Sequence, residues 1–295
     1  MLNMKKIKLL DGNCIPQIGL GTWQINPEDI DNTLKSAISI GYKHIDTAQI
    51  YNNEYEIGGF LKNNQASKDL FITTKVWPSN FSDEETFLTS IKQSLKRLNL
   101  ETIDLLLLHW PINGYSTNAY KWLEKAKDLN YCKSIGVSNF MIDHLKEILS
   151  ICKYKPVINQ IEFNPLIQQK ELIQFCFNNN IQVVGYSNIK PYLANKLSIE
   201  QNQQLKKIAQ DHQKTVPQII LRWVTQENII IIPKSTNTKR LVENFNLFDF
   251  ELSDSELEII RQMDRNDYQK AYKISKLKIC PFITYKIGFL FLFGK

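Results

Sequence analysis

The sequence contains few of the residues that build metal sites or disulfide frameworks. Its 295 residues include five cysteines and four histidines. The cysteines are odd in number and widely spaced, without a C-x-x-C pair, and the histidines form no H-x-H pair. These absences argue against a zinc site, a disulfide-stabilised fold and a metal-dependent hydrolase. We therefore expect a cytoplasmic protein with reduced, buried thiols and no bound metal.

Low-complexity tracts, runs of one charge sign and long apolar runs are also absent. The formal net charge is +6 and the pI is near 8.9. The lysines are scattered, so we expect no nucleic-acid partner. The net positive charge favours small anionic ligands such as phosphates. The N-terminus lacks the apolar core of a signal peptide. The apolar segment 287–295 is far shorter than the roughly 20 residues needed to span a bilayer.

Short apolar runs alternate with amphipathic stretches, which predicts alternating strands and helices. The expected strands cover residues 18–21, 44–46, 70–75, 103–108, 134–137, 157–161, 182–186 and 229–232. The expected helices cover residues 27–40, 54–61, 83–98, 118–129, 142–152, 169–178 and 216–226. Pro27 and Gly41 suit the two ends of the first helix, and Ser82 is the expected cap of the helix with an acidic first turn.

Apolar strands that are each followed by a helix indicate a parallel sheet covered on its outer face. Eight such units predict an α/β fold, the closed (β/α)8 TIM barrel, as a single domain over residues 1–295. The alternative, a doubly wound open sheet, usually carries G-x-G-x-x-G after its first strand, but Gln24 stands where the third glycine is needed. Residues 7–18 predict an N-terminal β-hairpin at the bottom of the barrel, with its turn at Asp11, Gly12 and Asn13.

Four residues that suit proton transfer stand at the ends of three successive predicted strands. Asp46, Lys75 and His109 each close an apolar run, and Tyr51 follows in the loop after the first of these strands. In a barrel, such strand ends meet at one mouth. A phenol has a pKa of about 10, and we expect the Lys75 ammonium, held by Asp46, to lower the pKa of Tyr51. With His109 hydrogen-bonded to the substrate, the set suits protonation of a carbonyl oxygen.

Longer motifs in the same order resemble the aldo-keto reductase family from about Gly19 to Phe250. They are GLGTW at 19–23, HIDTA at 44–48, TKVW at 74–77, LLHWP at 107–111, IGVSNF at 135–140, NQIEFNP at 159–165, VGYS at 184–187 and IPKS at 232–235. The resemblance implies a (β/α)8 barrel that binds NADPH without a Rossmann fold. It assigns Asp46, Tyr51, Lys75 and His109 as the catalytic residues, with Tyr51 as the proton donor.

The resemblance also implies a set of cofactor-binding residues at the strand ends. Short polar side chains there can grip the nicotinamide carboxamide, and Tyr186 resembles the family aromatic that stacks on the nicotinamide ring. The residues implied at this end of the cofactor are Thr22, Trp23, Asp46, Ser138, Asn139, Gln160, Tyr186 and Ser187.

Residues 233–240 follow the last predicted strand and lead into a helix, a place where barrels often bind phosphate. Lys234, Ser235 and Arg240 supply cationic and hydroxyl donors, and an arginine can grip a phosphate with two parallel hydrogen bonds. The resemblance places the 2′-phosphate of the cofactor here, which favours NADPH over NADH. The remaining residues implied at this end are Thr236, Glu243 and Asn244, the last two near the adenine.

The substrate mouth is expected to be aromatic. Trp23, Trp77 and Trp110 would line it beside Tyr51 and His109, and such walls select apolar or flat carbonyl compounds by shape. The expected protein is a monomeric, NADP-dependent oxidoreductase that reduces a small aldehyde or ketone. The alternative is a cofactor-sensing regulatory subunit with little turnover. In that case the apolar tail from about residue 266, where no family motif is found, would be a docking surface.

Overall fold

The computed structural model describes residues 5–64 and 69–265. Eight parallel strands form one sheet in chain order, and a parallel bridge between Ile18 and Ile231 joins its two ends. This closure confirms the predicted (β/α)8 barrel. The strands are β3 (Leu20–Gly21), β4 (His44–Asp46), β5 (Phe71–Val76), β6 (Ile103–Leu108), β7 (Cys132–Ser138), β8 (Ile158–Glu162), β9 (Gln182–Tyr186) and β10 (Ile230–Ile231).

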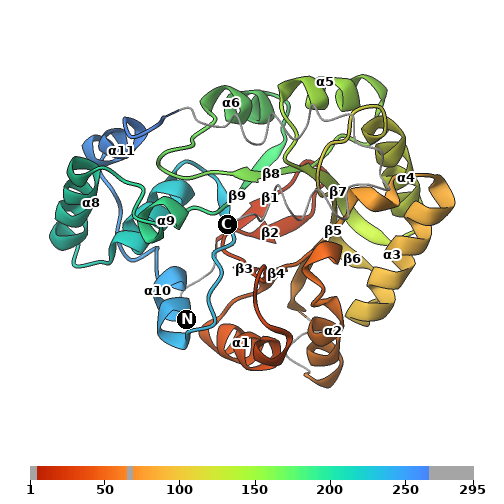
Figure 1. The fold of residues 1–295 in the computed structure, drawn as a ribbon, viewed down its shortest axis with the longest axis horizontal. Helices are drawn as coiled ribbons and strands as arrows, with labels where there is room; N and C mark the ends of the chain where they lie inside the picture. The colour runs from red at the N-terminus through yellow and green to blue at the C-terminus, as the bar shows by residue number, and fades with distance from the viewer. Residues whose placement is uncertain (1–4, 65–68, 266–295) are drawn as a thin grey trace.

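Helices surround the strands on the outside of the barrel (Figure 1). They are α1 (Pro27–Ile40), α2 (Glu54–Asn63), α3 (Glu84–Leu98), α4 (Ser116–Asp128), α5 (Ile142–Ile151), α6 (Lys170–Asn178), α7 (Lys190–Leu193), α8 (Ile199–Asp211), α9 (Val216–Gln226), α10 (Thr238–Phe245) and α11 (Asp254–Arg261). Among the residues described, no helix has both the length and the apolar character required to cross a membrane. The helices bury apolar stripes against the barrel, as Ile219 and Trp223 of α9 show. Each fully buried aliphatic or aromatic side chain contributes about 1.5–3 kcal/mol to stability.

The predicted N-terminal hairpin is present. β1 (Lys6–Lys8) and β2 (Cys14–Pro16) pair antiparallel. Gly12 in the turn has a φ of +89°, a conformation that glycine adopts without a steric penalty. Ile15 is fully buried in one cluster with Ile158, which begins β8. The hairpin therefore covers the N-terminal ends of the strands, opposite the end at which the candidate catalytic residues lie.

The predicted bounds of α1, α9, β4, β6 and β9 agree with the structure to the residue. The prediction that Ser82 caps α3 is wrong. Asp83 caps this helix instead, because its carboxylate reaches the Thr86 N–H at 2.8 Å, while the Ser82 hydroxyl donates to Asp83. The sequence patterns also missed α7, α8 and α11. Helix α8 buries only three of its thirteen residues, so its apolar periodicity is weak.

The cysteines in the described part of the chain carry free thiols. Cys132 and Cys176 are buried, and Cys152 is half-buried. The prediction of buried thiols is wrong for Cys14, which is exposed because its side chain points outward from the hairpin strand β2. Cys280 and the tail from about residue 266 lie outside the described residues.

His44 in β4 makes the stability of the fold depend on pH. Its ring packs against Gly19 and is bonded to the Thr73 hydroxyl through Nε2 at 3.0 Å. Burial, together with the charge of Lys75, lowers the pKa of His44 to about 3. Histidine in the unfolded chain titrates near pH 6.5, so below that pH only the unfolded state takes up this proton. The contribution is complete well above pH 6.5, and the free energy of unfolding should fall by about 2 kcal/mol between pH 7 and pH 5.

Urea unfolding of a His44→Gln variant between pH 7 and pH 5 tests this linkage. The slope of the free energy of unfolding against pH should be shallower than in the wild type by about 1 kcal/mol per pH unit. His212→Gln is the matched control, because the side chain of His212 is 21% exposed and His212 follows the C-terminal end of α8, away from β4. A wild-type slope in His44→Gln would contradict the role given to His44.

Candidate active site

The C-terminal ends of β4, β5 and β6 bring four side chains together. Asp46 is the last residue of β4, Lys75 is the last but one of β5, and His109 directly follows β6. Tyr51 ends a short 3-10 helix, Gln49–Tyr51, in the connection from β4 to α2. Because parallel strands of a barrel end at one mouth, residues far apart in the sequence meet there.

Lys75 lies at the centre of this cluster. Its Nζ is 2.6 Å from Asp46 Oδ1, 2.8 Å from the Thr47 carbonyl oxygen and 3.3 Å from the Tyr51 hydroxyl. The side chain of Lys75 is fully buried and that of Asp46 is 2% exposed. Two charges removed from water in this way depend on each other and on nearby dipoles for stabilisation. The ammonium therefore has three oxygen partners, and the phenol is one of them.

Burial shifts the pKa values of Tyr51 and Lys75. Burial and the negative charge of Asp46 raise the pKa of Tyr51 well above its usual value near 10. Burial also lowers the pKa of Lys75, against the opposing effect of Asp46 and Glu54. The prediction that Lys75 lowers the pKa of Tyr51 is therefore wrong, because desolvation and the charge of Asp46 both disfavour the phenolate. Tyr51 remains a neutral phenol at neutral pH and keeps a proton that it can donate.

His109 also lies beside the phenol. The centroids of the Tyr51 and His109 rings are 5.7 Å apart, with an interplanar angle of 75°. Burial and the charge of Lys75 lower the pKa of His109 well below 6.5. The imidazole is therefore neutral, so it can donate one N–H to an oxygen at the mouth without competing with Tyr51 as an acid.

Polar residues from β7, β8 and β9 join the same cluster. Gln160 Nε2 donates to Asp46 Oδ2 at 2.8 Å, the carboxylate oxygen that is not bonded to the ammonium. Ser138 Oγ donates to the Gln160 carbonyl oxygen at 2.9 Å. Asn139 donates to Ser138 Oγ at 3.0 Å and accepts from the Tyr186 hydroxyl at 2.7 Å. The predicted nicotinamide-binding residues of these strands therefore form one hydrogen-bonded group beside the candidate catalytic residues.

Aromatic rings flank the phenol and the imidazole. The Trp23 ring lies 4.8 Å from the Tyr51 ring, and the Trp77 ring lies 5.1 Å from the His109 ring, measured between centroids. Trp77 is 5% exposed and Trp110, directly after His109, is 8% exposed. The structure thus places two of the three predicted substrate-binding tryptophans against the rings of candidate catalytic residues.

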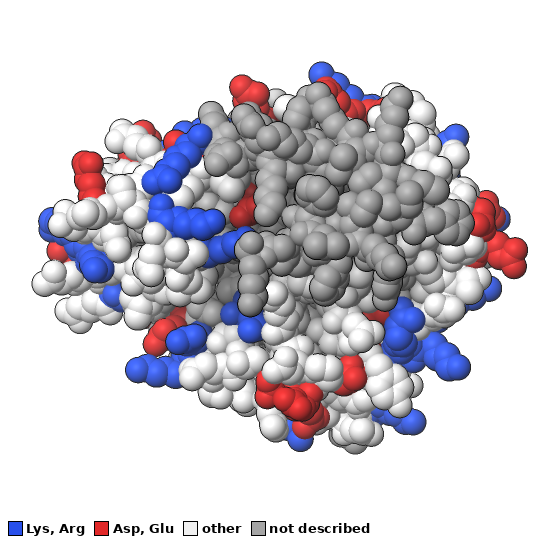
Figure 2. Space-filling model, viewed as in Figure 1, with Lys and Arg blue, Asp and Glu red and all other residues white. Residues whose placement is uncertain are grey.

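The predicted phosphate-binding segment follows β10 and leads into α10. Lys234, Thr236 and Arg240 are exposed, whereas Ser235 is buried. Asn237 caps α10 by accepting from the Arg240 N–H at 3.1 Å. Exposed cationic side chains at the start of a helix are a donor set that suits a phosphate. On the face shown in Figure 2, Lys and Arg side chains gather over the side that carries α9 and α10.

The remaining predicted cofactor-binding residues lie next to the catalytic cluster, after β9 and on α10. Thr22 follows β3, and its Oγ1 donates to the Asp46 carbonyl oxygen at 2.9 Å. Ser187 follows β9 with a φ of +57°. On α10, Asn244 is buried and Glu243 is half-buried. The structure thus joins Thr22 directly to the catalytic cluster, and the segment after β10 forms a separate polar group.

Thr47 and Asn53 support the cluster, although neither residue was assigned a role from the sequence. The Thr47 carbonyl oxygen accepts from Lys75, and the Thr47 hydroxyl donates to Asn53 Oδ1 at 2.7 Å. Asn53 Nδ2 donates in turn to the Thr22 carbonyl oxygen at 3.0 Å. Their position on either side of Tyr51 was a sequence signal that could have drawn attention to them.

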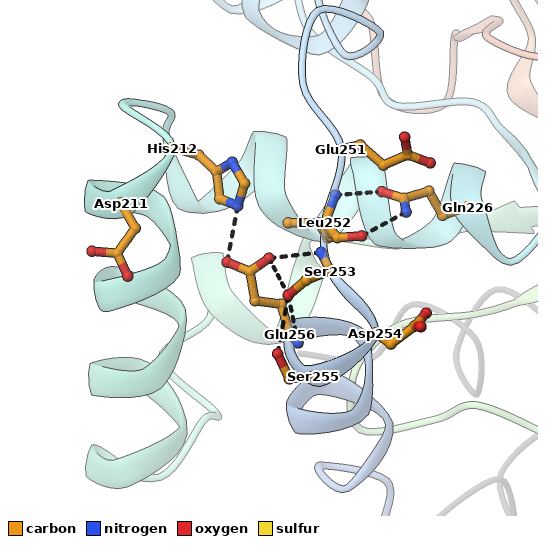
Figure 3. A pocket seen from close by; sticks show the side chains of 9 residues that line it. All are labelled: Asp211, His212, Gln226, Glu251, Leu252, Ser253, Asp254, Ser255 and Glu256. Carbon is orange, nitrogen blue, oxygen red and sulfur yellow. Dashed lines mark hydrogen bonds and ion pairs between the residues drawn. The ribbon is translucent and has the colours of Figure 1, made fainter.

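A hollow of about 800 Å³ lies elsewhere, between the C-terminal ends of α8 and α9 and the start of α11 (Figure 3). His212 Nε2 lies 2.9 Å from Glu256 Oε1, and Glu256 also accepts from the Ser253 N–H at 2.8 Å. Helix α9 leads into the start of β10, so its C-terminal end lies on the side of the barrel opposite the C-terminal strand ends. The candidate catalytic residues do not line this hollow, and its central carboxylate serves to cap α11.

Comparison with known proteins identifies the family. A family model described as the Aldo/keto reductase family matches residues 17–265. The glyoxal reductase of Bacillus subtilis (strain 168) is 39% identical over 263 residues, which cover 88% of this chain and 93% of that protein. The methylglyoxal reductase DkgA of Escherichia coli (strain K12) is 37% identical over 268 residues, which cover 90% of this chain and 95% of that protein.

Solved structures agree with this result. A Bombyx mori aldo-keto reductase in complex with NADP superposes with a TM-score of 0.84 at 32% identity, over 90% of this chain and 94% of that chain. The chain belongs to the aldo/keto reductase family and is therefore an oxidoreductase of the class that acts on carbonyl compounds with a nicotinamide cofactor.

Proposed function

We propose that this chain reduces aldehydes or ketones to alcohols with NADPH, and that Tyr51 donates the proton. The observation that carries the proposal is the position of Lys75 Nζ, 2.6 Å from Asp46 Oδ1 and 3.3 Å from the Tyr51 hydroxyl. A neutral phenol held in this way can protonate an oxygen on which negative charge develops. The buried ammonium stabilises the phenolate left behind, and the effect is stronger at a mouth from which water is excluded.

The other residues orient the substrate and the cofactor. When bound, NADPH supplies the hydride. The amides of Asn139 and Gln160 suit its carboxamide, and the Tyr186 ring suits its nicotinamide. The neutral imidazole of His109 donates a hydrogen bond to the carbonyl oxygen and so directs that oxygen at Tyr51. Trp23 and Trp77 exclude water from the reacting groups and select substrates by shape.

The relatives favour small carbonyl compounds as substrates, because two of them are named as glyoxal and methylglyoxal reductases. The test is to follow NADPH absorbance with glyoxal, methylglyoxal, aromatic aldehydes and sugar aldehydes. Turnover with small dicarbonyl compounds is expected. NADPH binding without turnover across the whole panel would overturn the proposal in favour of a cofactor-sensing subunit.

We also propose that the protein is a single-domain, cytoplasmic monomer. Size-exclusion chromatography with and without residues 275–295 tests its oligomeric state.

Arg240→Met tests the proposed binding of the 2′-phosphate. Loss of a charge-assisted contact costs about 1.5–3 kcal/mol, so the KM for NADPH should rise about 10- to 100-fold while the KM for NADH changes little. Lys62→Met on α2 is the control, because it removes one exposed positive charge from a different side of the barrel. Equal increases in the KM for both cofactors would contradict the assignment.

A further inference from the structure

Asn53 directly precedes α2, at the end of the connection that carries Tyr51, and its side chain is 1% exposed. Oδ1 accepts from the Thr47 hydroxyl at 2.7 Å, and Nδ2 donates to the Thr22 carbonyl oxygen at 3.0 Å. Both polar ends of the buried amide are therefore bonded. A buried amide satisfied at both ends is held in one orientation, because releasing either bond leaves a polar group without a partner.

These two bonds join three segments of the mouth. Thr22 follows β3 and donates to the Asp46 carbonyl oxygen through both its N–H and its hydroxyl, at 3.0 Å and 2.9 Å. Thr47 follows β4, and its carbonyl oxygen accepts from Lys75 Nζ at 2.8 Å. Hydrogen bonds thus connect Asn53 through Thr22 to the backbone of Asp46, and through Thr47 to the ammonium of Lys75.

The segment closed by the bond between Thr47 and Asn53 is the one that positions the phenol. Within it, the Tyr51 N–H donates to the Ala48 carbonyl oxygen at 3.0 Å, and the Asn52 N–H donates to the Gln49 carbonyl oxygen at 3.3 Å. Asn52, next to Tyr51, has a φ of +55°, which asparagine tolerates better than most residues but which is still uncommon. The side-chain bond across the ends of this turn therefore stabilises a backbone that has few local hydrogen bonds of its own.

We propose that Asn53 is a positioning residue that sets the distance between the Tyr51 hydroxyl and Lys75 Nζ. It acts by closing the segment 47–53 and by joining that segment to Thr22, without touching the reacting atoms. This inference rests on the proposed function, in which the contact of Tyr51 with Lys75 is needed for proton transfer. A displacement of about 1 Å in such a contact can cost about 100-fold in rate.

Two variants break the closure from opposite ends. Asn53→Ala removes both bonds, and Thr47→Val removes the hydroxyl while keeping the shape of the side chain and the carbonyl oxygen that Lys75 uses. Each should lower kcat by about 10- to 100-fold and change the Kd for NADPH less than about threefold, measured by fluorescence quenching. Thr47→Ser should retain nearly wild-type kcat. Combining Asn53→Ala with Thr47→Val should lower kcat no further than Asn53→Ala alone, because Asn53→Ala already removes the bond that Thr47→Val breaks.

Gln17→Ala controls for the loss of a buried amide as such. Gln17 is fully buried and donates to the Thr225 carbonyl oxygen at 2.9 Å, outside the mouth. Thermal unfolding shows whether each variant folds, and Thr47→Val is the decisive variant if Asn53→Ala does not. A kcat lowered no more than in Gln17→Ala, or a Kd for NADPH that rises in step with the fall in kcat, would overturn the inference. A wild-type chain without reductase activity would instead overturn the proposed function.

Discussion

Replacement of Tyr51 by phenylalanine is expected to lower kcat for carbonyl reduction by about 10²- to 10⁴-fold, the usual contribution of a positioned acid. The substitution keeps the ring, whose centroid lies 4.8 Å from that of Trp23, and removes only the hydroxyl that lies 3.3 Å from Lys75 Nζ. The Kd for NADPH should therefore stay near the wild-type value. Steady-state rates and cofactor fluorescence, measured on the same sample, separate the two effects.

Tyr55→Phe on α2 is the matched control, since it removes a phenol that is 74% exposed. Its kcat should not change. Because burial and Asp46 raise the pKa of Tyr51, ionisation of this phenol should not reduce wild-type activity up to pH 9. A wild-type rate in Tyr51→Phe would refute the assignment of the proton donor. A loss of activity in both tyrosine variants would point to a general effect of the substitution.

Lys75→Met should destabilise the fold as well as abolish turnover. It leaves the Asp46 carboxylate buried with Gln160 as its remaining side-chain hydrogen-bond donor. Removing one partner of a buried ion pair typically costs about 3–5 kcal/mol, because the other charge stays desolvated. The free energy of unfolding in urea should fall by that amount, and NADPH oxidation should fall to background.

Two further variants locate the cause of this loss. Replacing Asp46 by asparagine as well, in Lys75→Met/Asp46→Asn, removes the unpaired charge and should restore part of the stability but none of the activity. Lys153→Met breaks an ion pair with Asp128 whose side chains are 59% and 45% exposed, and it should lower the free energy of unfolding far less than Lys75→Met does. If the double variant were less stable than Lys75→Met, an unpaired buried carboxylate would not be the cause.

The barrel could be predicted because its signals are local. The apolar run of β6 ends where His109 begins, and α1 starts at Pro27 and stops before Gly41. These boundaries depend on neighbouring residues and not on distant ones. Helix α8 was missed for the opposite reason. Its sequence is mostly polar, and Leu205 and Ile208 become core residues only because α8 packs on α9 and α11.

The candidate site could be predicted in part. Asp46, Lys75 and His109 were found because each polar residue closes a strand, and parallel strands deliver their ends to one mouth. The hydrogen bond from Gln160 to Asp46 joins residues 114 positions apart, and no spacing in the sequence indicates it. The pKa of Tyr51 was predicted in the wrong direction, because residue types reveal a neighbouring charge but not how much water remains around it.

The amino-acid sequence by itself determined the order of strands and helices and the chemical groups carried at the strand ends, since both depend on periodicity and residue type over short stretches. Only the tertiary structure decided that Tyr51 stays protonated, that Lys75 is shared among three oxygens, and that Asn53 closes the turn between them. These properties come from desolvation and from contacts between separate strand ends, and they exist only once the barrel has closed.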